Sequence, residues 1–169
     1  LGGWRTEARS SWKAPKDTGR NRVDSYEEND IDLMRRRVEL QWAARINNAL
    51  EDNRFELFRH TILPLQVEDQ GEHYELLLRM RDENGSLVSP DLFITAAERY
   101  GIMPKVDRWV VSNALRWLVS EADERERLSL CTINLFGQSL TDDKFLALVT
   151  NGFPTSGLDP PLCCYEFSQ

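Results

Sequence analysis

The sequence predicts an α/β fold with a largely parallel sheet. Predicted helices and strands alternate along most of the chain, an order typical of parallel sheets with helical crossovers. The segment from Leu128 to Leu135 is an almost continuous apolar run, as expected for a parallel strand covered on both faces. No G-x-G-x-x-G pattern follows the first predicted strand, which disfavours a dinucleotide-binding sheet. Four strands of a TIM-like (β/α)8 barrel fit better, and we expect the N-terminal half of such a barrel, incomplete by itself.

The first predicted element is a helix from Leu33 to Asp52. Apolar residues recur through it at helical spacing, at positions 38, 42, 46, 49 and 50. The segment from Phe55 to Leu65 predicts the first strand, and the segment from about His73 to Met80 predicts the second. A polar turn around Gly71 separates these strands, and Asp82-Glu83-Asn84-Gly85 forms a turn after the second.

Helices and strands continue to the end of the chain. Ser89-Pro90-Asp91 combines a capping residue with Pro at the first helical position, and it predicts a helix that Gly101 ends. A second helix follows Pro104, and its predicted buried stripe is Val106, Trp109, Val110, Ala114, Trp117 and Leu118. After the apolar strand, we expect a short helix around residues 143–149. A segment rich in Gly and Pro then leads into a last strand, Leu162 to Phe167.

Composition restricts the class of protein. The chain has 169 residues, of which 41% are hydrophobic, enough for one core of ordinary size. Its 28 acidic and 21 basic residues give a net charge of -7, so we expect no nucleic acid polymer as a partner. No run approaches the roughly 18 apolar residues of a membrane span, and no signal-peptide pattern is present, so we expect a cytoplasmic chain. Cys131, Cys163 and Cys164 lie in apolar strand-like runs and are predicted to be small buried residues in a reducing compartment.

Three oxygen-bearing side chains occur in or at the ends of predicted strands. These are Glu75 in the second strand, Asn134 near the end of the third, and Glu166 in the fourth. Because the strand ends of a parallel barrel converge on one face, these side chains could share a hard divalent cation such as Mg²⁺ or Mn²⁺. The alternative from spacing alone is a solvent-facing Glu75, a turn-forming Asn134 and a Glu166 that forms an ion pair.

The residues around these positions resemble those of a known family. The segment Tyr74-Glu75-Leu76-Leu77-Leu78-Arg79, with residues 84–85 and 89–94, resembles the signature of EAL domains, with Leu76 in place of the usual Ala. Other segments resemble further parts of the EAL domain, in the same order along the chain. Residues 55–58 and 62 precede the signature, and residues 97–101, 106–110, 133–135, 138–140 and 165–168 follow it. The resemblance runs from about residue 36 to the end.

This resemblance implies a TIM-like barrel that hydrolyses cyclic di-GMP to the linear dinucleotide. It implies that Glu75, Asn134 and Glu166 bind Mg²⁺ or Mn²⁺, which would lower the pKa of a bound water. It also implies that Arg79 contacts a substrate phosphate, for which its planar guanidinium is suited, and that Leu77 and His60 lie at the substrate. For Arg79, a structural ion pair is the alternative.

The sequence also departs from the pattern of the family. His60-Thr61 stands where Gln-Pro is usual, Phe136 where Ser commonly follows Asn-Leu, and Gln169 in place of the second Glu of E-x-T-E. The tandem Asp motif, the general-base Lys and a later Glu of the family are expected beyond residue 169. We therefore expect a fragment of a phosphodiesterase that is inactive as an isolated chain. A degenerate module that binds cyclic di-GMP or a protein without turnover is the alternative.

The N-terminal region is predicted to be separate. Residues 16–23 resemble the closing helix and strand of GGDEF domains, so we interpret residues 1–33 as a degenerate GGDEF tail and linker, and residues 34–169 as the N-terminal portion of an EAL domain. Upstream GGDEF or sensory domains are then expected in the parent protein. A homodimer through the EAL domain and an upstream inner-membrane anchor are left open.

Overall fold

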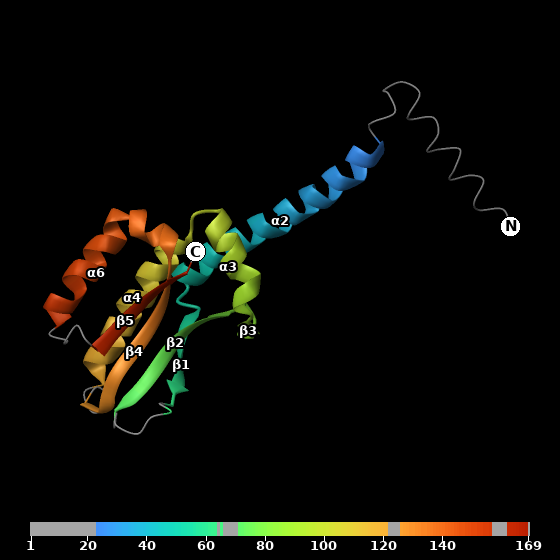
Figure 1. Cartoon of the computed structure of the whole chain (residues 1–169). Helices are drawn as coiled ribbons and strands as arrows, with labels where there is room; N and C mark the ends of the chain where they lie inside the picture. The colour runs from blue at the N-terminus through green and yellow to red at the C-terminus, as the bar shows by residue number, and fades with distance from the viewer. Residues whose placement is uncertain (1–22, 64, 66–70, 122–125, 157–161, 169) are drawn as a thin grey trace. The chain divides into compact units, whose positions relative to one another are not determined.

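The computed structural model describes residues 23–63, 65, 71–121, 126–156 and 162–168. Contacts divide the chain into two compact units, Leu1–Gln41 and Trp42–Gln169, and the boundary falls within helix α2, Val23–Glu51 (Figure 1). The second unit contains the sheet. Its strands are β1 (Phe55–Ile62), β2 (Glu72–Arg81), β3 (Leu87–Val88), β4 (Leu128–Phe136) and β5 (Cys163–Ser168). Its helices after α2 are α3 (Pro90–Arg99), α4 (Met103–Ser120), the 3-10 helix η1 (Gly137–Thr141) and α6 (Asp143–Ser156).

The sheet is mixed, with the strand order β1-β2-β4-β5 and β3 beside β2. β2, β4 and β5 are parallel, whereas β1 is antiparallel to β2. The connection from β1 to β2 is too short for a helical crossover, so these strands form a hairpin. Helices α3 and α4 connect β2 to β4, and α6 connects β4 to β5 (Figure 1). The expected α/β fold is therefore confirmed, but the sheet is mixed rather than largely parallel: β2, β4 and β5 are parallel, and β1 and β3 are antiparallel to β2.

The hydrophobic core lies between one face of the sheet and the helices. Leu76 and Met80 of β2 and Ile133 of β4 are buried there. Phe55, at the start of β1, packs edge-on against Phe93 of α3, with ring centroids 5.8 Å apart, and also against Trp109 of α4. Helices α4 and α6 pack on each other, and Gly152 permits a close approach because a Cβ there would lie 2.7 Å from Leu115 Cδ1.

Four elements and two cysteines differ from the expectation. Strand β1 ends at Ile62 rather than Leu65. Cys131 is buried as expected, but Cys163 is half-buried and Cys164 is exposed on β5. Helix α2 starts at Val23 rather than Leu33, because no Gly or Pro interrupts the charged segment before Leu33. Farther along the same exposed helix, Arg35 and Glu39 form an ion pair one turn apart at 3.8 Å. Helix α6 continues to Ser156, beyond the expected end near residue 149. The short strand β3 had no signal in the sequence.

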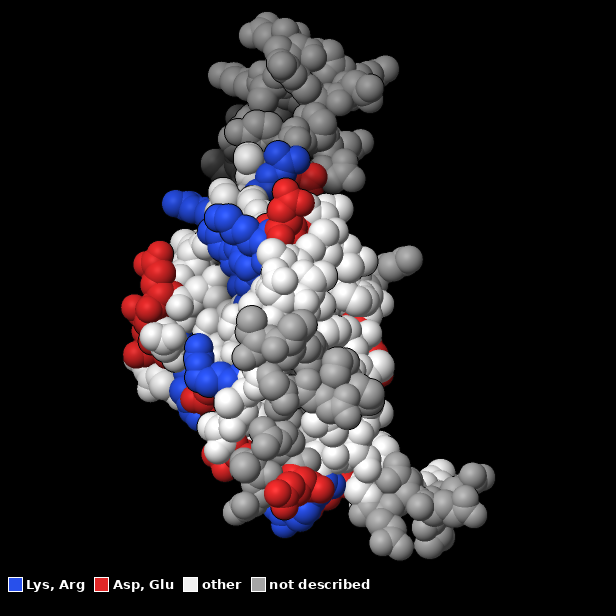
Figure 2. Space-filling model, turned by 90° about the vertical axis from the view of Figure 1, so that its left-hand side faces the viewer, with Lys and Arg blue, Asp and Glu red and all other residues white. Residues whose placement is uncertain are grey.

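Charged side chains of opposite sign are interspersed on the surface. On the face in Figure 2, blue Lys and Arg groups lie beside red Asp and Glu groups. Arg45 pairs with Glu83 at 3.1 Å, and Arg108 pairs with Asp142 at 2.5 Å. Within the described part of the chain, no helix has the length and apolar character needed to cross a membrane.

Candidate functional site

The residues predicted to form the site lie on the sheet face opposite the core. Side chains alternate between the two faces of a strand, so Leu76 and Met80 of β2 point to the helices while Glu75, Leu77 and Arg79 point the other way. The pairing of β1 with β2 places His60 opposite Glu75. The pairing of β4 with β5 places Asn134 opposite Glu166. We call this surface, made of His60, Glu75, Leu77, Arg79, Asn134 and Glu166, the site face.

Glu75 connects three strands at the centre of the site face. Its Oε1 accepts a hydrogen bond of 2.8 Å from Asn134 Nδ2 on β4. Its Oε2 lies 3.5 Å from His60 Nδ1 on β1. The Glu75 side chain is 31% exposed and that of His60 is 67% exposed, so solvent and ligands can reach both. The structure thus brings together two residues that are 59 positions apart in the sequence.

Glu75, Asn134 and Glu166 have the donor chemistry of a site for a hard divalent cation. Two carboxylates and one amide oxygen form an all-oxygen set, which Mg²⁺ and Mn²⁺ prefer. The bond to Glu75 occupies the amide nitrogen of Asn134 and leaves its oxygen as the atom able to bind metal. Glu166 is exposed on β5 beside Asn134. Among the described residues, no group of three His, Cys, Asp or Glu side chains could hold a metal ion, so a site here would need the amide oxygen of Asn134 as well.

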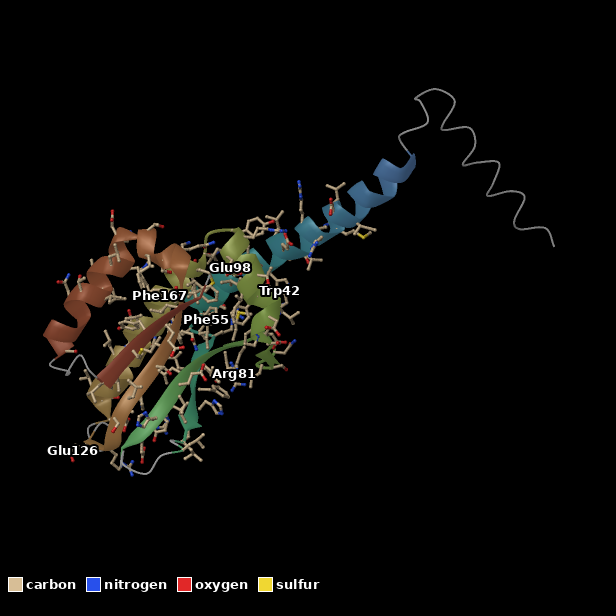
Figure 3. All side chains as sticks on the ribbon, in the orientation of Figure 1. Trp42, Phe55, Arg81, Glu98, Glu126 and Phe167 are labelled. Atoms are coloured by element: carbon tan, nitrogen blue, oxygen red, sulfur yellow. The ribbon has the colours of Figure 1, made fainter. Side chains whose placement is uncertain are left out.

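Arg79 presents its guanidinium on the same face. Nη1 donates to the carbonyl oxygen of Leu78 at 2.8 Å, and Cζ lies 5.8 Å from the ring centroid of Phe58. Glu56 is opposite Arg79 in the strand register, but it bonds to Arg81 at 2.5 Å. Arg81 is labelled in Figure 3. Among the described residues, Arg79 thus contacts the carbonyl oxygen of Leu78 and the ring of Phe58, and no carboxylate forms an ion pair with it.

Comparison with known proteins places this arrangement in a family. The family model described as the EAL domain matches residues 43–165. The chain belongs to the EAL domain family.

Curated relatives of this EAL domain include enzymes. The chain is 30% identical over 156 residues to the cyclic di-GMP phosphodiesterase PdeB of Shewanella oneidensis, covering 92% of this chain and 18% of that protein. It is 34% identical over 132 residues to the cyclic di-GMP phosphodiesterase NbdA of Pseudomonas aeruginosa, covering 75% of this chain and 17% of that protein. The chain therefore spans less than a fifth of these relatives.

Solved EAL domains have the same fold. The EAL domain of FimX from Pseudomonas aeruginosa, bound to c-di-GMP, has a TM-score of 0.65 at 29% identity, and the match covers 75% of this chain and 49% of that one. The EAL enzyme Bd1971 in its cAMP-bound form has a TM-score of 0.65 at 22% identity, and the match covers 89% of this chain and 43% of that one. The prediction that the chain forms part of a TIM-like barrel is confirmed. Of the expected GGDEF tail and linker, residues 1–22 lie outside the described residues, and residues 23–33 belong to helix α2.

Asp107 of α4 contacts the site region, and our reading of the sequence assigned it no role. It is 1% exposed, and its Oδ2 accepts hydrogen bonds from Phe136 N at 2.9 Å and Ser139 Oγ at 2.5 Å. Burial raises its pKa to about 6, although both hydrogen bonds act in the opposite direction. One feature of the sequence could have indicated this contact: Asp107 directly follows Val106, a residue of the predicted buried stripe of the helix, where an acidic side chain is unusual.

Proposed function

We propose that this chain is part of a phosphodiesterase that hydrolyses cyclic di-GMP to the linear dinucleotide, in which Glu75, Asn134 and Glu166 bind a divalent cation, Mg²⁺ or Mn²⁺. The chain by itself is expected to be inactive, because the general-base Lys of the family is not among its residues. The observation that carries the proposal is the hydrogen bond between Glu75 and Asn134, which joins two oxygen ligands on neighbouring strands of an EAL domain. Its relatives PdeB and NbdA are named as phosphodiesterases of this dinucleotide.

The side chains of the site face have distinct parts in this proposal. A bound cation would neutralise negative charge at the phosphodiester and acidify a water ligand. Glu75 is held in place by Asn134 and His60, so one carboxylate is oriented before the cation arrives. Arg79 would bind a phosphate oxygen, because its fork of donors faces no competing carboxylate among the described residues. Leu77, next to Phe58 in the strand register, would contribute apolar contact to the substrate.

A second candidate is binding of cyclic di-GMP without turnover. It is favoured by the match to the FimX EAL domain, whose structure holds c-di-GMP. His60 and Phe136, which depart from the residues usual in the family, lie at or beside the proposed ligands. In this case Arg79 and the site face would serve recognition only.

The test compares wild-type protein at its natural full length with Glu75→Gln. Hydrolysis of cyclic di-GMP is followed by chromatography in Mg²⁺ and in Mn²⁺, and binding by calorimetry. We expect Glu75→Gln to lower the rate by roughly 100-fold or more, because even an outer partner of a metal ligand is worth about 10- to 100-fold. Glu72→Gln, a change on the same strand, is the matched control and should retain activity.

The outcomes separate the two candidates. Wild-type protein that binds cyclic di-GMP but does not hydrolyse it with either metal supports the second candidate. Hydrolysis that persists in Glu75→Gln would show that the cation is not bound here. Absence of both binding and hydrolysis in the wild-type protein would overturn both candidates.

A further inference from the structure

We infer that Asp107 is a positioning residue that holds the end of strand β4, and with it Asn134, in the geometry that the proposed cation site requires. The inference rests on the proposed function for the identity of the site. The contact that carries it lies on the core side of the sheet, away from the site face.

One carboxylate oxygen joins three elements. Asp107 lies in α4, and its Oδ2 accepts from the backbone N–H of Phe136, the last residue of β4, and from the hydroxyl of Ser139 in η1. Phe136 is the N-cap residue of η1 and has no side-chain capping bond of its own. The carboxylate from α4 therefore satisfies the backbone N–H of the N-cap residue, a donor that the N3 side chain of a capping box would otherwise serve.

The position of Phe136 determines the position of Asn134. The two residues are separated by Leu135, whose side chain is buried in the core, so the backbone between them has little freedom. Asn134 donates to Glu75 and lies opposite Glu166. A shift of the β4 end would change both relations. A second tie, from Gln138 Nε2 to the carbonyl oxygen of Glu98 at 2.9 Å, holds η1 to α3 but does not reach β4 (Glu98 is labelled in Figure 3).

The energetic cost of Asp107 favours positioning over simple stabilisation. The carboxylate of Asp107 is buried, and none of the ion pairs among the described residues includes it. The neighbouring cation, Arg108, pairs with Asp142 instead. Burying a carboxylate without a cation is unfavourable, and a well-packed apolar residue avoids this cost. What an apolar residue cannot supply is the bond to Phe136 N.

The experiment compares Asp107→Ala with Asp142→Ala in the protein at its natural full length. Asp142 is the matched control because its Oδ1 likewise accepts from a backbone N–H, that of Phe145 at 2.7 Å, and from a second side chain, Arg108. Asp142 directly precedes α6, and its side-chain partners among the described residues, Phe145 and Arg108, are not in β4. The readouts are thermal unfolding, the Mg²⁺ concentration for half-maximal hydrolysis, and the NMR signals of the Asn134 side-chain amide.

We expect both variants to lose stability, but only Asp107→Ala to raise the half-maximal Mg²⁺ concentration, by about 10- to 100-fold. Asp107→Asn, which retains an acceptor oxygen, and Ser139→Ala, which retains the bond to Phe136, should give smaller effects. These two variants replace Asp107→Ala in the comparison if it does not fold. The Asn134 amide signals should move in the Asp107 variants and stay unchanged in Asp142→Ala.

The inference would be overturned if Asp107→Ala and Asp142→Ala changed the Mg²⁺ dependence and the Asn134 signals equally. It would also be overturned if Asp107→Ala changed neither the Mg²⁺ dependence nor the Asn134 signals. If the wild-type protein lacks metal-dependent hydrolysis, the proposed function fails. The Asn134 signals then still decide whether Asp107 positions this residue.

Discussion

At the scale of single residues, two carboxylates with opposite surroundings define the region around Asn134. Glu75 is partly exposed on the site face, where it accepts a hydrogen bond from Asn134 of β4 and lies 3.5 Å from His60 of β1. Asp107 is buried on the core side and holds the end of β4. The exposed carboxylate of Glu75 can be reached by a ligand, whereas the buried carboxylate of Asp107 can only contact the protein itself. The difference in burial therefore separates the two proposed roles.

Asp107 should make stability depend on pH. Its pKa is raised from 3.8 to about 6 in the folded chain, so the unfolded chain releases this proton at lower pH. The contribution of Asp107 to the free energy of unfolding should therefore fall as pH rises from about 4 to about 6, by on the order of 3 kcal/mol, and stay constant above that range. Urea unfolding of wild type and Asp107→Asn across this range measures the difference. A difference between the two proteins that does not change with pH would contradict the assignment.

At the scale of elements, the junction between α3 and α4 shows how local chemistry ends a helix. Gly101 has φ of +64°, and its N–H donates to the carbonyl oxygen of Glu98 at 3.1 Å. The chain then enters α4 at Met103. The sequence predicted this end correctly because the conformational freedom of Gly is a local property.

Gly101→Ala should lower the free energy of unfolding by about 1 kcal/mol, because an L-residue with a Cβ is strained at positive φ. No atom lies within 4 Å of a Cβ placed there, so steric contact adds nothing. Gly101→Asn is the matched variant and should cost less, since Asn tolerates this conformation, as Asn53 at φ 54° does in this chain. Thermal unfolding gives the order, and an Asn variant less stable than the Ala variant would refute this reasoning.

At the scale of the whole molecule, the chain has one unit with a packed core and one whose described part is a helix. Most side chains of residues 31–41 in α2 are exposed, whereas the unit Trp42–Gln169 buries Phe93, Met80 and Ile133. Helices packed on a core resist local opening more than exposed helices do. The central strands β2 and β4 are paired on both sides and carry buried core residues, so their backbone hydrogen exchange should be the slowest in the chain.

Phe93→Ala tests this division. Phe93 is 0% exposed and contacts Phe55, so we expect a loss of about 3–5 kcal/mol in the free energy of unfolding. Exchange in β2 and β4 should accelerate, while exchange in residues 31–41 should not change. Leu92→Ala, at an exposed neighbouring position, should stay within about 0.5 kcal/mol of wild type. If residues 31–41 lose protection together with the strands, the two units open as one.

Local pattern predicted most of the helices and strands and the family. The periods of α3, α4 and β4, the Gly at position 101 and the ordered EAL-like segments are all properties of neighbouring residues, so they can be read without a structure. The start of α2 was missed because its first half is charged and has no apolar stripe.

Only the tertiary structure decided which distant residues meet. The antiparallel direction of β1 places His60 beside Glu75, and the register of β2, β4 and β5 brings Asn134 to Glu75 and Glu166. The contact from Asp107 to Phe136 depends on how α4 packs against β4. Register and packing are set by pairing between segments far apart in the chain, and no local pattern contains that information. The sequence by itself thus predicted the type of site and its candidate residues, and the structure decided the geometry in which these residues lie.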